Sequence, residues 1–108
     1  MGNNIIITIT CLPPDGVDIP WFELSYEAND TVKWQNTSGK ECTLDFKGGH
    51  PFPHSITIEP GQESPPFSAR NGPAPSPDCP PGQIYRVYYY SVTCAKGCSF
   101  DPGGGMRP

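Results

Sequence analysis

The sequence predicts an all-β protein built as a two-sheet sandwich of about seven strands. Wherever apolar residues cluster, they alternate with polar residues, which is the period of a strand with one buried face. Gly and Pro make up 27 of the 108 residues, and eight of the fifteen prolines lie between residues 60 and 81. No window of helical length carries an apolar stripe of period 3.6. Because a small half-buried sheet needs a cover, we expect two sheets packed face to face.

The first half of the chain contains four segments with this alternation. Residues 5–11 and 21–26 are two expected strands, separated by the turn sequence Pro-Pro-Asp-Gly of residues 13–16. Residues 31–36 and 42–46 are close enough to form a hairpin. Alternate residues of a strand point to the same face, and the residues expected to face inward are Ile5, Ile7, Ile9, Cys11, Val32, Trp34, Cys42, Leu44 and Phe46.

The second half of the chain contains a Pro-rich loop between further strands. Residues 54–59 form one expected strand, and the loop covers about residues 60–82. The longest strand is expected from Gln83 to Cys94, followed by a turn at residues 95–97 and a return strand that begins with Cys98 to Asp101. We expect residues 1–108 to form a single domain. The inward-facing residues expected here are Ile56, Ile58, Tyr88, Tyr90, Val92 and Cys94.

Charge and cysteine content narrow the class of protein. Seven basic and eleven acidic residues give a net charge of -4, which argues against a nucleic-acid partner. No apolar run approaches the roughly 20 residues of a membrane span. Five cysteines in 108 residues favour an extracytoplasmic location, periplasmic or secreted, and no signal peptide is visible in the sequence. Asn29 and Asn36 begin glycosylation acceptor patterns, which occur often by chance.

Two motifs resemble the cupredoxins. Residues 29–36, Asn-Asp-Thr-Val-Lys-Trp-Gln-Asn, resemble an early strand of that family, and Tyr90 to Cys94 is similar to the strand that carries the copper-binding cysteine of plastocyanin-like members. Met106 lies downstream, where the family often places an axial methionine. The resemblance covers about residues 21–106 and implies a Greek-key arrangement of the sandwich.

The copper ligand set that the resemblance implies is incomplete. A blue-copper site needs two imidazoles, one thiolate and a weak axial ligand. Cys42 occupies the position of the first family histidine, and no histidine follows Cys94. His50 and His54 flank two prolines, and in an extended segment they would be up to about 13 Å apart. We expect one of these histidines to be exposed and the other to face inward.

The cysteine pairing has two interpretations. Cys94 and Cys98 flank a three-residue turn, and facing side chains at a hairpin end can reach disulfide distance, so a Cys94–Cys98 bond is expected. Alternatively, Cys94 remains a thiolate and joins Cys42 at a metal. The pairing of Cys11, Cys42 and Cys79 stays open, and the odd number of cysteines leaves at least one outside an internal bond.

Two functional hypotheses follow, and neither involves an enzyme, because no catalytic constellation is recognisable. The first is a non-catalytic, extracytoplasmic cupredoxin-like module for binding or assembly, with a protein partner or self-association and no cofactor. Tyr85 and Tyr89, which are expected to face outward, are candidates for its surface. The second is a copper protein for electron transfer or copper handling. Its ligand candidates, a set soft enough to prefer Cu(I), are Cys42, Cys94, Met106 and one of His50 or His54.

Overall fold

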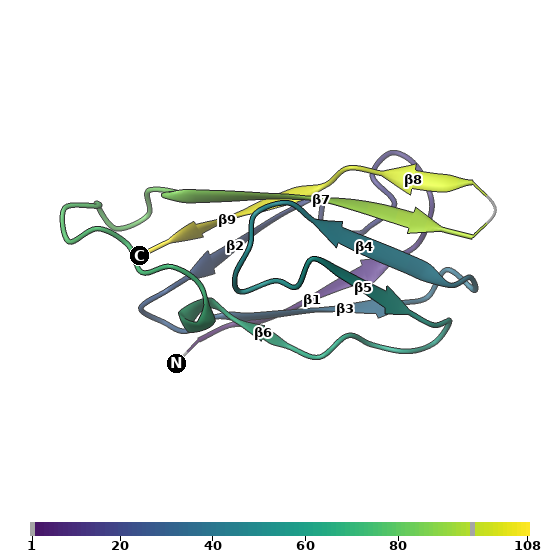
Figure 1. Cartoon of the computed structure of the whole chain (residues 1–108), viewed down its shortest axis with the longest axis horizontal. Helices are drawn as coiled ribbons and strands as arrows, with labels where there is room; N and C mark the ends of the chain where they lie inside the picture. The colour runs from purple at the N-terminus through teal and green to yellow at the C-terminus, as the bar shows by residue number, and fades with distance from the viewer. Residues whose placement is uncertain (1, 96) are drawn as a thin grey trace.

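The computed structural model describes residues 2–95 and 97–108, and their regular structure is almost entirely β (Figure 1). The elements are β1 (Asn4–Ile9), β2 (Trp21–Ser25), β3 (Thr31–Asn36), β4 (Cys42–Phe46), β5 (Ser55–Ile58), β6 (Phe67–Ser68), the 3₁₀ helix η1 (Ala69–Asn71), β7 (Arg86–Cys94), β8 (Cys98–Phe100) and β9 (Gly103–Arg107). Among the described residues, no helix has the length and apolar character needed to cross a membrane.

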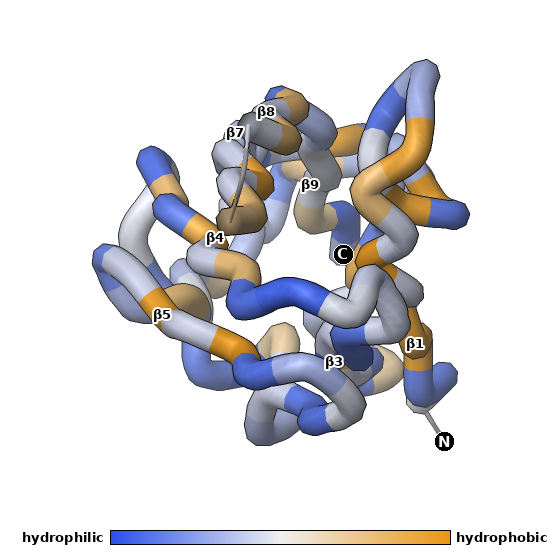
Figure 2. Tube along the Cα trace, turned by 90° about the vertical axis from the view of Figure 1, so that its right-hand side faces the viewer, coloured by the Kyte–Doolittle hydropathy of each residue, from blue (hydrophilic) through white to orange (hydrophobic). Residues whose placement is uncertain are grey.

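The strands form two sheets. Three strands, in the order β1-β3-β6, make the smaller sheet, and the larger has the order β2-β9-β7-β4-β5 with β8 paired to the end of β7. The pairs β1/β3 and β2/β9 are parallel, and the remaining pairs are antiparallel. The molecule is elongated, with extents of 46 × 22 × 21 Å, and the strands surround the core when viewed end-on (Figure 2). The predicted all-β, two-sheet architecture is therefore confirmed. The hairpin expected from residues 31–36 and 42–46 is wrong, because β3 pairs with β1 and β6 in the smaller sheet whereas β4 pairs with β5 and β7 in the larger one.

Strands β8 and β9 are two parts of one return strand. The pairing of β7 with β8 and with β9 has a single register, in which Val92 faces Phe100 and Tyr89 faces Gly103. Proline has no backbone N–H to donate, so the ladder is interrupted at Pro102, whose carbonyl still accepts a hydrogen bond from the Tyr90 N–H at 3.2 Å. The return strand was expected to begin at residues 98–101, and the structure continues it to Arg107. Its continuation places β9 inside the larger sheet, between β7 and β2.

An aromatic cluster joins the two sheets. Trp34 on β3 is fully buried, and its indole N–H donates a hydrogen bond of 3.1 Å to the hydroxyl of Tyr90 on β7. The two ring centroids are 5.4 Å apart in an edge-to-face arrangement, which the electrostatics of aromatic rings favour. The ring centroids of four phenylalanines lie within 6.0 Å of the Trp34 centroid: Phe22, Phe46, Phe52 and Phe67.

Most of the core predicted by parity is confirmed. Trp34, Leu44, Tyr88 and Tyr90 are buried, as are most of the other residues expected to face inward. The exceptions are partly buried and pack against the edge of the core: Ile5, Cys11 and Ile56. Phe22 and Leu24 on β2 complete the interior. Alternation thus identified the correct face of every strand to which it was applied.

Two buried polar side chains fix the turns at the ends of β3. The carboxylate of Asp30 accepts hydrogen bonds from the backbone N–H groups of Asn3 and Ser25, at 2.7 and 2.8 Å. At the other end, the amide of Asn36 donates to the carbonyl oxygens of Lys40 and Ile58, at 2.6 and 2.8 Å. Because buried polar groups are costly unless they are paired, these bonds select the observed turn conformations.

Replacing Trp34 with Ala should lower the free energy of unfolding by about 3 to 5 kcal/mol, because it removes the largest core side chain and leaves a cavity. Urea unfolding followed by circular dichroism measures the loss. Tyr89→Ala is the control, since Tyr89 is 62% exposed and outside the core. Equal stability of the Trp34 variant and the wild type would contradict the role assigned to this side chain.

Alkaline pH should destabilise the fold through its buried tyrosines. Burial raises the pKa of Tyr90, and it also raises the pKa of Tyr88 and takes that of Tyr85 to about 12. The folded state therefore disfavours phenolate. We expect the contribution of these tyrosines to the free energy of unfolding to be constant below about pH 10, the ordinary tyrosine pKa, and to fall as the pH rises above it.

Tyrosinate absorbance measures this effect directly. The folded protein should require a higher pH than the urea-unfolded protein to reach the same absorbance. Superimposable titration curves for the two states would show that the fold does not hold these phenols neutral.

Candidate functional site

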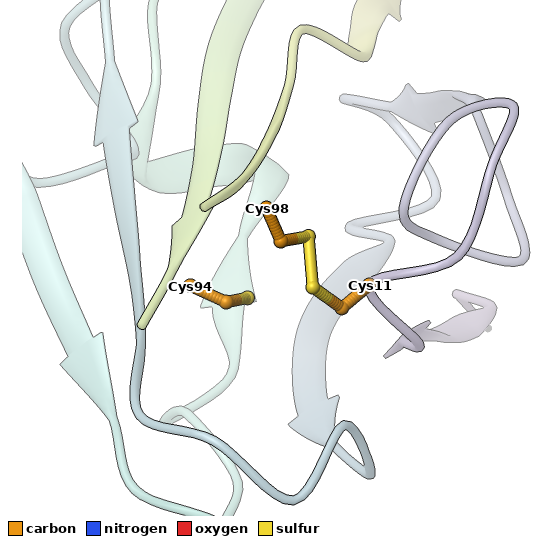
Figure 3. Close-up of side chains that lie close together, drawn as sticks. All are labelled: Cys11, Cys94 and Cys98. Carbon is orange, nitrogen blue, oxygen red and sulfur yellow. A yellow bond between two sulfur atoms is a disulfide. The ribbon is translucent and has the colours of Figure 1, made fainter. Parts of the chain in front are cut away.

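Four cysteines gather at one end of the sandwich. Cys42, Cys94 and Cys98 lie side by side on β4, β7 and β8, because Cys94 faces Cys42 in one strand pairing and Cys98 in the other. Cys11 follows β1 and approaches this row from the smaller sheet. The sulfur atoms of Cys11, Cys94 and Cys98 all lie within 4.8 Å of one another (Figure 3).

The cysteine pairing differs from the expected one. Both Cys94 and Cys98 are in disulfides, but Cys94 is bonded to Cys42 and Cys98 to Cys11. The expected Cys94–Cys98 bond is therefore wrong for this structure. The hairpin argument correctly placed these two residues opposite each other, but it could not show that each also has a neighbour from a distant part of the chain. Lys96, in the turn between them, lies outside the described residues.

The alternative copper ligands are not brought together. Cys42 and Cys94 are bonded to each other, and a sulfur in a disulfide cannot act as a thiolate ligand. Met106 is buried at the other end of β7, opposite Arg86, about 25 Å from Cys94 by the rise of a strand.

The two histidines are both exposed, so the expectation that one faces inward is wrong. Both residues accept hydrogen bonds through their backbone carbonyls. The carbonyl of His50 accepts from the Tyr88 hydroxyl at 2.7 Å, and the carbonyl of His54 accepts from the Phe46 N–H at 3.0 Å. His54 precedes β5, which is the outer strand of its sheet. Its side chain therefore lies beyond the area that the core covers.

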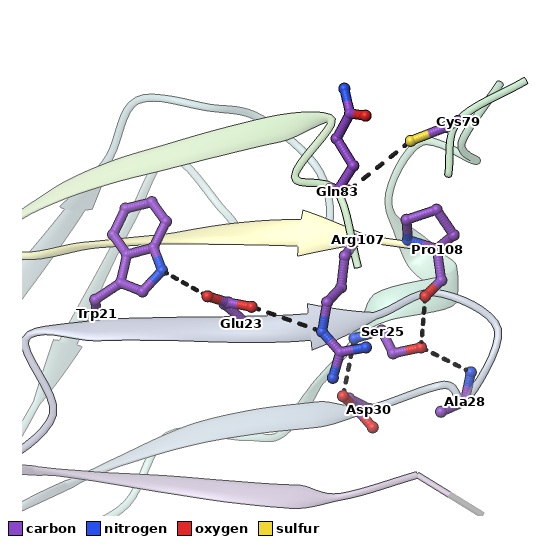
Figure 4. Close-up of polar contacts among 9 residues, drawn as sticks. All are labelled: Trp21, Glu23, Ser25, Ala28, Asp30, Cys79, Gln83, Arg107 and Pro108. Carbon is purple, nitrogen blue, oxygen red and sulfur yellow. Dashed lines mark hydrogen bonds and ion pairs between the residues drawn. The ribbon is translucent and has the colours of Figure 1, made fainter. Parts of the chain in front are cut away.

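Cys79 is a free thiol in the Pro-rich loop and is partly buried. Its sulfur lies 3.8 Å from the carbonyl oxygen of Gln83 (Figure 4) and 3.8 Å from that of Pro80. It takes part in neither disulfide.

A second feature is an apolar surface on the outer side of the larger sheet. We call it the aromatic face and define it by Trp21, Ile84, Val87 and Tyr89. At its centre β9 has glycines, and the Trp21 ring lies 3.4 and 3.1 Å from the positions that β-carbons at Gly103 and Gly105 would occupy. A β-carbon at Gly105 would crowd both the ring and Ile84, which lies 2.8 Å from that position, whereas one at Gly103 would only touch the ring. Gly105 thus makes room for the ring.

Polar contacts fix the orientation of Trp21. Its indole N–H donates a hydrogen bond of 3.2 Å to one carboxylate oxygen of Glu23, and the other oxygen lies 3.6 Å from Nε of Arg107 (Figure 4). The ring therefore lies over β9 with its N–H group paired, although 42% of the residue remains exposed. Sequence reasoning missed Trp21. The alternation along β2 could have predicted it, because adjacent residues of a strand point to opposite faces and Phe22 is buried.

The two tyrosines expected on the outer surface have different environments. Tyr89 is exposed, as predicted, and belongs to the aromatic face. Tyr85 is only partly buried rather than fully exposed, and its hydroxyl donates a hydrogen bond of 2.8 Å to the carbonyl of Pro73. It fastens the Pro-rich loop to the end of the sandwich.

Comparisons with known proteins give no relative. A scan against protein-family models found no match, and a search of curated proteins found none either. The functional argument therefore depends on the two features described above.

Peptide mapping without reduction should find the Cys11–Cys98 and Cys42–Cys94 bonds, with Cys79 alkylated as the free thiol. A thiol assay on the unfolded protein should count one thiol for each chain. The Cys79→Ser variant is the control and should give no thiol. A peptide containing a Cys94–Cys98 bond in the fully oxidised protein would contradict the structure.

Proposed function

We propose that this protein is a non-catalytic, extracytoplasmic module of cupredoxin-like, Greek-key architecture that assembles with a second copy of itself through the aromatic face. Two disulfides support an oxidising location. The two motifs that resemble cupredoxins occupy β3 and β7, which face each other across the core through Trp34 and Tyr90. This supports the resemblance at the level of architecture.

The observation that carries the proposal is the concentration of exposed apolar residues on the aromatic face. Among the described residues, five large apolar side chains are exposed, and three of them, Trp21, Val87 and Tyr89, belong to this face. Single exposed apolar residues are ordinary, but a contiguous group with a polar rim is typical of an interaction surface. The Trp21 ring adds to this, because a side chain that is already hydrogen-bonded in the free protein loses less entropy on binding than an unpaired one.

Charge around the face favours a second copy as the partner. Both signs are present beside it: Glu23 is paired with Arg107, Lys47 is next to Tyr89 across the β4/β7 ladder, and Asp45 faces Ser91 further along. A surface of one sign would repel its own copy, whereas a mixed surface can meet itself about a two-fold axis. We therefore assign the face to a symmetric dimer of packed sheets.

The copper hypothesis has no comparable support. Its two cysteines are joined in a disulfide and its methionine is at the opposite end of β7. No contact among the described residues favours it over assembly.

Sedimentation velocity across the micromolar to millimolar range tests the proposal. The Cys79→Ser protein should pass from monomer to dimer as its concentration rises, and Val87→Lys should remain monomeric because it places a charge inside the interface. The Cys79→Ser background removes the possibility of a dimer linked through that thiol.

Leu12→Lys is the matched control, because Leu12 is exposed and apolar but outside the aromatic face. It should dimerise like its parent. A parent protein that stays monomeric at millimolar concentration, or a Val87→Lys variant that dimerises equally well, would overturn the proposal.

A further inference from the structure

The four clustered cysteines show a gradient of exposure. Cys11 is the most exposed, Cys98 is 8% exposed, Cys94 is 2% exposed, and Cys42 is completely buried. The Cys11–Cys98 bond thus lies nearer the surface, and the Cys42–Cys94 bond lies in the core. An external thiol can reach the Cys11–Cys98 bond more readily than the Cys42–Cys94 bond.

The Cys94 sulfur is within reach of a second partner. It is bonded to Cys42, yet its register partner on the other side is Cys98, and the Cys94 and Cys98 sulfurs are no more than 4.8 Å apart (Figure 3). Paired residues in a sheet point to the same side. Rotation of side chains can therefore bring these two sulfurs together without a change of strand register.

At the buried end, the Cys42 sulfur has one side-chain hydroxyl within reach that could donate a hydrogen bond to it as it leaves. The Cys42 sulfur lies 3.2 Å from the hydroxyl of Ser38 and 3.5 Å from the carbonyl of Lys40. The Ser38 hydroxyl proton can point to the sulfur or to Oδ1 of Asn36 at 2.7 Å. A donor to the departing sulfur stabilises it, and the Lys40 carbonyl can accept the proton of the resulting thiol.

We propose that the two disulfides form an exchange relay that accepts electrons from an external dithiol. In the first step the dithiol reduces the Cys11–Cys98 bond, is itself oxidised to a disulfide, and transfers two electrons and two protons. In the second step the Cys98 thiolate attacks Sγ of Cys94, the Cys94–Cys98 bond forms, and the Cys42–Cys94 bond breaks.

The second step involves no net oxidation. The proton that leaves Cys98 is balanced by the proton that the Cys42 thiolate takes up. The product carries a Cys94–Cys98 bond and thiols at Cys11 and Cys42. Its formation is favoured kinetically because both sulfurs belong to one folded hairpin, so the attack is intramolecular.

Partial reduction followed by trapping tests the relay. The Cys79→Ser protein is treated without oxygen with one equivalent of dithiothreitol, quenched in acid at a series of times, alkylated and mapped. We expect alkylated Cys11 and Cys42 together with a Cys94–Cys98 bond. Alkylation of Cys11 and Cys98 with the Cys42–Cys94 bond intact, or reduction of Cys42–Cys94 first, would overturn the proposal.

A pair of serine variants separates the second step from the first. Ser38→Ala should slow the appearance of the Cys42 thiol by about tenfold, the effect of losing one hydrogen bond to a charged group, and leave reduction of the Cys11–Cys98 bond unchanged. Ser99→Ala, an exposed change next to Cys98, should match its parent in both steps. An equal rate of Cys42 release in the two variants would exclude the role given to Ser38.

Discussion

The hydrogen bond from Trp34 to Tyr90 is the contact on which the arrangement of the two sheets depends. It joins the middle of β3 to the middle of β7, and both side chains are buried. The net energy of such a bond is small, but breaking it is costly, because sliding either sheet would leave two buried polar groups without partners. Apolar packing alone would tolerate small shifts, and this bond removes that freedom. The alignment of the sheets that it holds also brings Cys11, which follows β1 in the smaller sheet, next to Cys98 in the larger one.

The sequence was sufficient for the fold class and for most of the core, and insufficient for contacts between distant segments. Alternation identified the buried faces of β3, β4 and β7 because the period of a strand is a local property. The pairing of Cys11 with Cys98 joins residues 87 positions apart, and no local pattern encodes it. The expected bond between Cys94 and Cys98 shows the limit clearly. The hairpin was correctly described, but each of its cysteines is bonded to a cysteine from another part of the chain.

The aromatic face was only partly predictable for a related reason. Parity gave the outward direction of Tyr89, and it would have given that of Trp21. The role of the glycines in β9 could not be predicted from the sequence, because glycine has no side chain and so gives no pattern of apolar and polar residues. Their function is steric, and it depends on a ring supplied by a strand about eighty residues earlier in the chain. Only the three-dimensional arrangement shows that the missing side chain at Gly105 makes room for Trp21 on one side of the sheet and that at Gly104 makes room for Phe22 on the other.

The Cys11–Cys98 bond also determines how the chain responds to proteolysis. It closes a covalent ring that contains the Pro-rich loop, η1 and every strand from β2 to β7. A protease that cuts this loop once would open the ring without releasing a fragment, because both cut ends remain joined through the sulfur bridge. The severed molecule would keep its mass, apart from the water added at the cut, and its two sheets would remain tethered. Only segments outside the ring, with β1 at one end and β9 at the other, could be lost to a single cut.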